Sequence, residues 1–148
     1  MISIIRAILD VYHRLLPNTH LLSHENLCLQ AWRNVLSSQS RFILDAQLAT
    51  AYFVQRQAFG AKVCFYYPTD AQTPLFNERT PGAHAATVTL RTSGSSEMER
   101  MRVNIFVNRG RFFSIEFPKR PERYWEQHSM RGRPLEVDNV QVHCQMDQ

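Results

Sequence analysis

The stretch that decides the fold is residues 101–117, MRVNIFVNRGRFFSIEF. Apolar and polar residues alternate on both sides of Asn108-Arg109-Gly110, and this alternation is typical of strands with one buried face. Gly110 can adopt a positive φ without steric cost, so these three residues suit a hairpin loop closed by a bulge. The pattern therefore predicts an antiparallel β-hairpin, with one face in the core and one wetter face.

The length of the loop sets the register of the hairpin. A three-residue loop pairs apolar residues with one another on one face and leaves Arg102 opposite Glu116 on the other. A rival two-residue loop, Arg109-Gly110, would place Asn104 opposite Ile115 and mix the two faces. Since a slip of one residue moves every side chain to the other face, we prefer the three-residue loop. The predicted pairs are Val107–Arg111, Ile105–Phe113, Val103–Ile115 and Met101–Phe117 on the apolar face, and Arg102–Glu116, Asn104–Ser114 and Phe106–Phe112 on the other.

Length and composition predict one folded domain over residues 1–148. Hydrophobic residues make up 44% of the 148 positions and charged residues 20%, which is enough apolar material for a core and does not indicate disorder. The three cysteines, Cys28, Cys64 and Cys144, are odd in number and far apart, and no CxxC motif occurs. We therefore expect three free thiols and a reducing, cytoplasmic location.

The apolar N-terminus does not match a targeting segment. It carries Asp10, has no basic region at its start, and is not followed by a small-residue cleavage site, so we do not expect a signal peptide. No run of about 18 apolar residues occurs, which predicts that no segment spans a membrane and that no membrane is a partner.

Two helices are predicted before the sheet. Residues 3–16 carry apolar side chains at helical spacing, and Pro17 ends this segment. Residues 24–36 form the second predicted helix, with Ser23 as its N-cap and Glu25 in the first turn, where the helix dipole favours an acid.

Residues 41–59 are ambiguous, because their first half suits a helix and their second half a strand. We prefer a short helical or irregular entry followed by a strand over residues 48–57. Together these patterns predict an α+β fold, in which two N-terminal helices pack on an antiparallel sheet of five to six strands. A short helix near the C-terminus completes the prediction, over residues 121–128. The remaining strands are predicted at residues 62–67, 85–91 and 137–144, besides the hairpin.

The candidate binding residues come from the basic part of the chain. The net charge is +4, and residues 109–133 hold seven basic residues against three glutamates, interleaved with aromatic side chains. Cations and exposed aromatics together suit either a protein partner or the phosphates and bases of a nucleic acid, whereas the simpler interpretation is a solvated rim around the core. The candidate partner-binding residues are Phe106, Arg109, Arg111, Phe112, Lys119, Arg120, Arg123, Tyr124 and Trp125.

The sequence contains few residues in patterns typical of a metal site or of a catalytic nucleophile. His20 and His24 are four residues apart, which would suit metal ligands on one helix, but His20 precedes the predicted N-cap. His143 and Cys144 are adjacent on a predicted strand, so their side chains should point to opposite faces. The chain lacks the common nucleotide-binding, hydrolase and zinc-protease motifs. We therefore expect no catalytic residue, no metal and no cofactor.

No motif matches a known family. In size and outline the chain resembles small bacterial immunity proteins of toxin systems, a similarity of shape alone that implies a protein as the partner. Our leading hypothesis is a non-enzymatic protein-interaction domain, such as an immunity or accessory protein of a bacterial toxin or secretion system. The alternatives are a nucleic-acid-binding module that uses the basic residues of 109–133, and an enzyme whose site assembles only in three dimensions.

Overall fold

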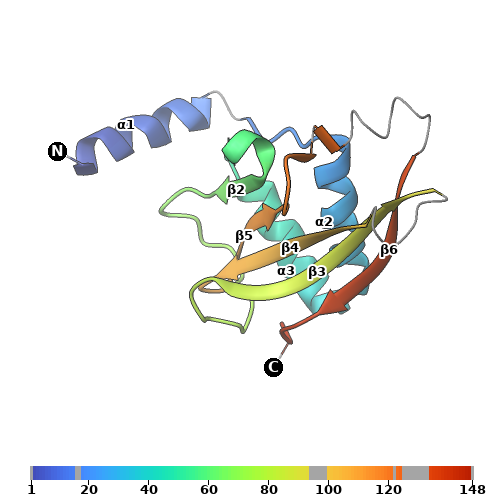
Figure 1. Ribbon diagram of the computed structural model, residues 1–148. Coiled ribbons are helices and arrows are strands. Elements are labelled where there is room, and N and C mark those ends of the chain that lie inside the picture. The colour runs from blue at the N-terminus through green and yellow to red at the C-terminus, as the bar shows by residue number, and fades with distance from the viewer. Residues whose placement is uncertain (1, 16–17, 94–99, 122, 125–133, 148) are drawn as a thin grey trace.

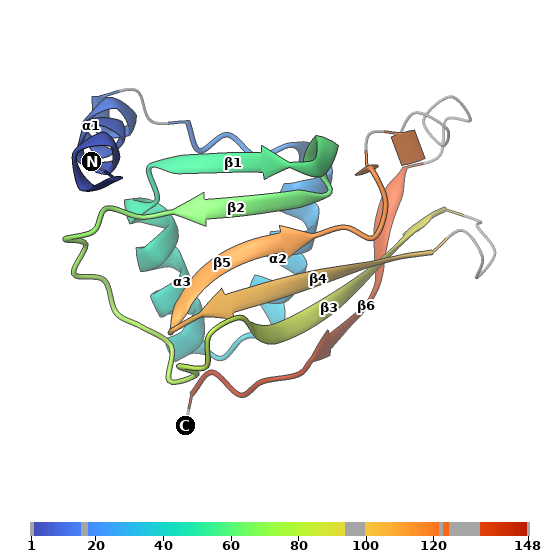
Figure 2. The ribbon, with the colours of Figure 1, turned by 60° about the vertical axis from the view of Figure 1, so that its left-hand side comes forward.

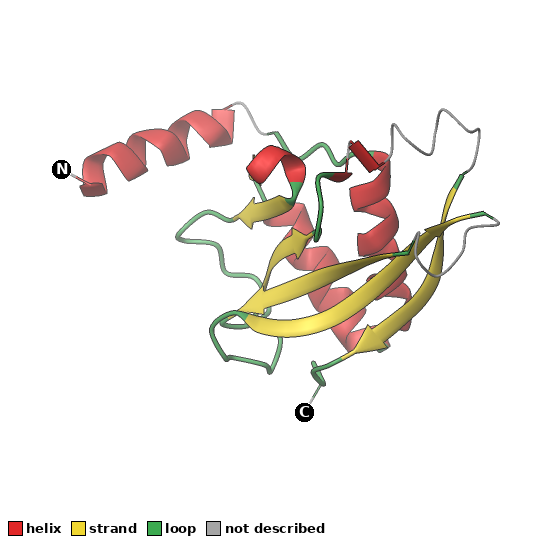
Figure 3. Ribbon diagram, viewed as in Figure 1, coloured by secondary structure: helices red, strands yellow, loops and turns green. Residues whose placement is uncertain are grey.

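A computed structural model describes the chain except for residues 1, 16–17, 94–99, 122, 125–133 and 148. The described strands form one six-stranded sheet in which every neighbouring pair is antiparallel, with the order β1-β2-β5-β4-β3-β6. Figures 1 and 3 show α2 and α3 on one face of this sheet. The elements are α1 (Ile2–Leu15), α2 (Ser23–Val35), α3 (Ser38–Thr50), β1 (Phe53–Gln57), a 3-10 turn (Ala58–Gly60), β2 (Lys62–Tyr66), β3 (Ala83–Thr92), β4 (Met101–Asn108), β5 (Arg111–Glu116) and β6 (Leu135–Val142).

The predicted α+β class and the antiparallel sheet are confirmed. Strand β4 shows why the alternation was informative, since Met101, Val103, Ile105 and Val107 are all buried while Arg102 is exposed. Side chains two residues apart share a face of a strand, so this strand turns its apolar face to the helices and its polar face outward.

The predicted register of the hairpin is wrong. The turn has two residues, Arg109 and Gly110, whose φ angles of 50° and 83° match a type I′ turn. Val107 therefore lies opposite Phe112, and a bulge then inserts Phe113 as an extra residue. Beyond the bulge Ile105 faces Ile115, so both strands again present apolar residues to the core.

The bulge decides which of two adjacent phenylalanines enters the core. Phe112 is fully buried, and its ring centroid lies 4.5 Å from that of Phe65 and 5.7 Å from that of Trp32. Phe113 is only partly buried, and the Lys62 ammonium lies 5.7 Å from its ring. The predicted pairing of Phe106 with Phe112 on the wetter face therefore does not occur.

Helix α2 begins differently from its prediction. Its N-cap is Leu22, and Ser23 is already the first helical residue. Glu25 does lie in the first turn, where its Oε2 accepts a hydrogen bond from the Leu22 backbone N–H at 2.9 Å. The carboxylate is fully buried and binds Arg56 of β1, so α2 is tied to the edge of the sheet.

Helix α3 occupies most of the ambiguous segment. Ser37 caps it by accepting a hydrogen bond from the Ser40 N–H at 3.1 Å, and the helix continues to Thr50. Ile43, Leu44 and Gln47 are buried at the spacing of one helical face. The predicted strand from residue 48 is thus wrong over its first part, and β1 begins only at Phe53.

Helix α1 forms close to its predicted bounds but does not cover the sheet. It makes no extended contact with any other described element, and Figures 1 and 2 show it projecting from the rest of the chain. The two helices that pack on the sheet are therefore α2 and α3. The exposed large apolar side chains of α1 are Ile4, Ile5, Ile8, Leu9, Val11, Tyr12 and Leu15.

Within the described residues, no helix is both long and apolar enough to cross a membrane. The predicted helix over residues 121–128 lies mostly outside the described residues, although Pro121, Arg123 and Tyr124 are helical.

The three cysteines are free, as predicted. Burial, with a smaller contribution from the neighbouring Glu25 carboxylate, raises the pKa of the Cys28 thiol to about 12. Cys28 thus behaves as a small apolar side chain of the core.

Candidate functional site

The described residues of the basic stretch do not form one continuous surface. Arg109 lies in the turn at one end of β5, whereas Lys119 and Arg120 follow the other end of this strand. Six residues of extended chain span roughly 20 Å, which is the order of the distance between the two groups of charges. The residues predicted to bind one partner together are therefore split between two ends of the sheet.

The hairpin end contains two residues that serve the fold. Arg111 donates from Nη2 to the Ala71 carbonyl at 2.9 Å, and its guanidinium lies 5.7 Å from the Tyr67 ring centroid. Phe112 is fully buried and cannot contact a partner without unfolding, so its assignment to the binding surface is wrong. Arg109 remains exposed at the tip of the turn. Trp125 lies outside the described residues.

The opposite end carries an unusual turn between β1 and β2. Ala58, Phe59 and Gly60 follow one another with φ angles of 49°, 56° and 82°. A bulky side chain in this left-handed region is uncommon and carries a backbone cost, and such strain occurs preferentially at binding and catalytic sites. The strained residue here is Phe59, and its ring is 70% exposed. The backbone thus holds a large apolar side chain in solvent.

Basic side chains surround this exposed ring. The Arg120 guanidinium carbon lies 3.8 Å from the Phe59 ring centroid, a short cation–π distance. Lys119, Arg120, Arg123 and Tyr124 line a surface hollow of about 350 Å³ beside it. We refer to Phe59 with these four residues as the Phe59 patch.

The Phe59 patch rests on a rigid support. The Phe117 N–H donates to the Ala61 carbonyl at 2.7 Å, which joins the chain after β5 to the turn. The ring of Tyr124 packs against the core, where it lines a small apolar space with Leu90 and Phe117. The first contact joins the two segments that carry the patch, and the second anchors Tyr124 in the core.

A second group of polar side chains lies on the face of the sheet that the helices leave open. Its centre is Thr87, which is almost fully buried. The Thr87 hydroxyl donates to Asn104 Oδ1 at 3.0 Å and lies 3.1 Å from His84 Nε2 and 2.9 Å from His143 Nε2. The hydroxyl has one proton, which goes to Asn104, and the direction of its two contacts with the imidazoles depends on the tautomer of each ring.

The rings of this group stack in a row. The centroids of His143 and His84 are 4.2 Å apart, and those of His84 and Phe106 are 5.1 Å apart. Desolvation and the neighbouring His84 and Arg102 lower the pKa of His143 below its ordinary value of 6.5. We refer to His84, Phe106 and His143 as the ring row. Its outer surface offers flat faces to a ligand that can stack.

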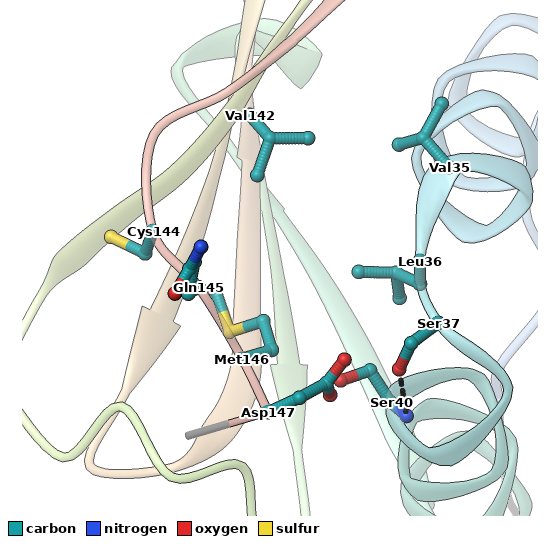
Figure 4. A pocket seen from close by; sticks show the side chains of 9 residues that line it. All are labelled: Val35, Leu36, Ser37, Ser40, Val142, Cys144, Gln145, Met146 and Asp147. Carbon is teal, nitrogen blue, oxygen red and sulfur yellow. Dashed lines mark hydrogen bonds between the residues drawn. The ribbon is translucent and has the colours of Figure 1, made fainter.

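A cavity of about 330 Å³ lies where α3 begins. Figure 4 shows the side chains of Ser40 and Asp147 directed into it, while the Cys144 sulfur points away. Ser40 Oγ is buried and has no hydrogen-bond partner among the residues that the structure describes. Val35, Leu36, Val142 and Met146 line the remaining wall, together with Ser37 and Gln145. The Cys144 thiol donates to the His84 carbonyl at 3.1 Å, so it forms no dyad with His143.

His20 and His24, which are four residues apart in the sequence, make separate contacts in the structure. His24 packs edge-on against Phe117, with ring centroids 5.3 Å apart, and the His20 carbonyl accepts a hydrogen bond from Arg56. Among the described residues, no three His, Cys, Asp or Glu side chains gather in a way that could hold an ion.

Sequence reasoning missed the residue at the centre of the Phe59 patch. In the sequence Ala58-Phe59-Gly60, the glycine suggests a turn, but no feature indicates that the Phe59 ring is exposed. It also missed the contact of His84 with His143, because these residues are far apart in the chain and meet only when β6 pairs with β3. An alternation pattern assigns a residue to a face but does not say which strands are neighbours.

Comparison with known proteins gives no further assignment: no family model, no curated protein and no solved structure matches this chain.

Proposed function

We propose that this chain is a non-enzymatic interaction domain of the cytoplasm that binds an acidic surface of another protein through the Phe59 patch. The observation that carries the proposal is the exposed Phe59 ring, which a strained turn holds beneath the Arg120 guanidinium. Immunity and accessory proteins act in this way, by occupying a partner rather than by transforming a substrate.

The composition of the patch supports this role. Aromatic residues and arginine dominate the energetics of protein interfaces, where a few anchors at the centre contribute most of the affinity. Phe59 supplies the anchor, and the exposed Lys119 and Arg123 beside it supply positive charge. A partner with carboxylates around an apolar pocket would complement this arrangement, because opposite charges raise the association rate and fix the orientation.

The test begins with capture of partners from the source cell by the purified full chain, followed by measurement with the purified partner. Phe59→Asn removes the ring, while asparagine tolerates the positive φ at this position. We expect this variant to weaken the complex by at least roughly 30-fold, as loss of an aromatic anchor does. Arg120→Gln should weaken it as well, whereas Arg109→Gln at the far end of the sheet should not.

These variants decide the proposal. A partner that binds the Phe59→Asn and Arg120→Gln proteins as tightly as the unchanged chain would contradict it. Circular dichroism and urea unfolding of each variant show whether a loss of binding reflects a loss of fold.

A second function has an observation of its own in the ring row. The exposed His143 and the partly buried His84 and Phe106 on an open sheet face, with Arg102 near them, suit the stacking of unpaired bases and contact with phosphates. Labelled single-stranded RNA and DNA would test this alternative. Steeply salt-dependent binding that Phe106→Ala and His84→Ala abolish would favour the nucleic-acid function over the protein-binding one.

A further inference from the structure

Helix α1 exposes a wide apolar surface, and it makes no extended contact with the other elements that the structure describes. Its exposed side chains include Ile8 at 63% and Leu15 at 75%. Soluble proteins seldom expose a continuous apolar patch of this size unless something binds it. Some occupant is therefore needed to account for α1.

The surface of α1 has the shape that receives a side chain of another helix. Ile4, Ala7, Ile8 and Val11 surround an apolar hollow on one side of α1. These positions are i, i+3, i+4 and i+7, which is the set of four residues that forms the hole in knobs-into-holes packing. The small Ala7 leaves room for the knob. A lipid surface requires no such spacing, so the hollow favours a helix as the occupant.

The helix that fits this hollow is α1 of a second copy. Ile4, Ile8, Val11 and Leu15 follow one another at spacings of four, three and four residues, which is the heptad seam of paired helices. In an antiparallel pair about a two-fold axis, Ile4 would face Leu15 of the other copy and Ile8 would face Val11. The same residues then serve as knobs on one helix and as holes on the other, as an isologous interface requires.

The seam side chains Ile4, Ile8, Val11 and Leu15 are each more than half exposed, so a paired helix would bury apolar surface that now faces solvent. Figures 1 and 2 show that α1 projects from the body, which leaves its length accessible to a second helix.

We propose that the protein forms a two-fold homodimer through antiparallel pairing of α1 with α1 of a second copy. The seam consists of Ile4, Ile8, Val11 and Leu15, and Ile5, Leu9 and Tyr12 flank it. This surface is separate from the Phe59 patch, so dimerisation and partner binding succeed or fail independently.

Sedimentation of the full chain tests the proposal over roughly 1 to 100 µM, since interfaces of standard size span micromolar to much tighter affinity. We expect a particle of twice the 17.3 kDa chain mass. The double variant Ile8→Glu with Val11→Glu should sediment as a monomer. Phe42→Glu is the matched control, because Phe42 is 67% exposed on α3 and lies outside the seam, and this variant should stay dimeric.

Cross-linking tests the register. In a Cys144→Ser background, mixing the single variants Ile8→Cys and Val11→Cys should give a disulfide-linked pair under mild oxidation, whereas neither variant alone should link to itself. Self-linking of each single variant would indicate parallel helices and would overturn the proposed pairing.

Two further outcomes would overturn the dimer. One is a monomer at every concentration. The other is a monomer that floats with vesicles of anionic phospholipid, when the Ile8→Glu, Val11→Glu variant does not float. This result would mean that α1 binds a lipid surface.

Discussion

The Glu25 carboxylate and the Arg56 guanidinium form a two-point ion pair between helix α2 and strand β1. Arg56 Nε lies 2.7 Å from Glu25 Oε1, and Arg56 Nη2 lies 2.6 Å from Oε2. The same Nη2 donates to the His20 carbonyl at 2.8 Å. Because the carboxylate is fully buried, this pair and the Leu22 N–H provide its stabilisation.

The first prediction concerns this ion pair. Arg56→Met should lower the free energy of unfolding by about 3 kcal/mol, because a buried carboxylate is left without its partner. Glu25→Gln in the same chain should recover much of this loss, since the amide carries no charge to stabilise. Urea unfolding of the two single variants and the double variant measures the coupling, and strictly additive losses would contradict the pairing.

The second prediction concerns Gln47, a fully buried side chain of α3 that binds two loops. Its Nε2 donates to the carbonyls of Pro74 and Gly110, both at 2.9 Å, and its Oε1 accepts from the Phe112 N–H at 2.8 Å. Gln47→Leu should cost about 2–4 kcal/mol, since buried backbone groups lose their partners. Thermal unfolding measures the loss. The exposed Gln39 of the same helix is the control, and Gln39→Leu should change little.

The third prediction tests the bulge in β5. Phe112→Ala should destabilise the fold by roughly 3–5 kcal/mol, because it empties a volume between Trp32 and Phe65. Phe113→Ala should cost about 1 kcal/mol or less, since this ring is only partly buried. Chemical unfolding compares the two variants. The reverse order of losses would restore the three-residue loop and its register.

The fourth prediction separates backbone strain from steric overlap at two glycines. Gly110 and Gly82 both have positive φ, but a Cβ on Gly110 would lie 2.9 Å from the Phe76 carbonyl oxygen, whereas nothing lies within 4 Å of a Cβ on Gly82. Gly82→Ala should cost about 1 kcal/mol for its conformation alone. Gly110→Ala should cost clearly more, and equal melting temperatures for the two variants would contradict the close approach.

The fifth prediction concerns the titration of the ring row. The pKa of His143 should lie below 6.5 in NMR titrations of the folded chain. His84→Gln and Arg102→Gln should each raise the pKa of His143, because both neighbours lower it. The unfolded chain binds this proton more tightly than the folded one, so the contribution of His143 to stability falls as the pH drops below 6.5. A titration midpoint at or above 6.5 would contradict this.

The sequence predicted the class of the fold because burial enforces a period of two on strands. In β4, Val103 and Ile105 lie in the core and Arg102 does not, as alternation requires. The register of the hairpin was wrong for a local reason. A bulge at Phe113 changes the face of every residue beyond it in β5, so Phe112 and Ile115 both enter the core, and a search for strict alternation does not find such an extra residue.

Other errors came from interactions between distant parts of the chain. The segment 41–59 has mixed propensities, and the burial of Gln47 beneath the hairpin turn favours the helix over the strand. The amphipathic pattern of α1 predicted a helix correctly, but amphipathicity does not say which surface covers its apolar face. The candidate site was predicted in part, since Lys119, Arg120, Arg123 and Tyr124 share one hollow, whereas Phe59 carried no signal in sequence.

The strand order has a consequence for the kinetics of folding. Strands β3, β4 and β5 form a meander of local hairpins, but β2 pairs with β5 across more than fifty residues, as in Lys62 opposite Glu116. Closing such long loops costs entropy before any contact offsets it, which slows folding. During synthesis β1 and β2 leave the ribosome first, yet they cannot join the sheet until β5 emerges. Until then β2 is paired only with β1 and its other edge is open to other chains, so slow translation would favour aggregation of this protein.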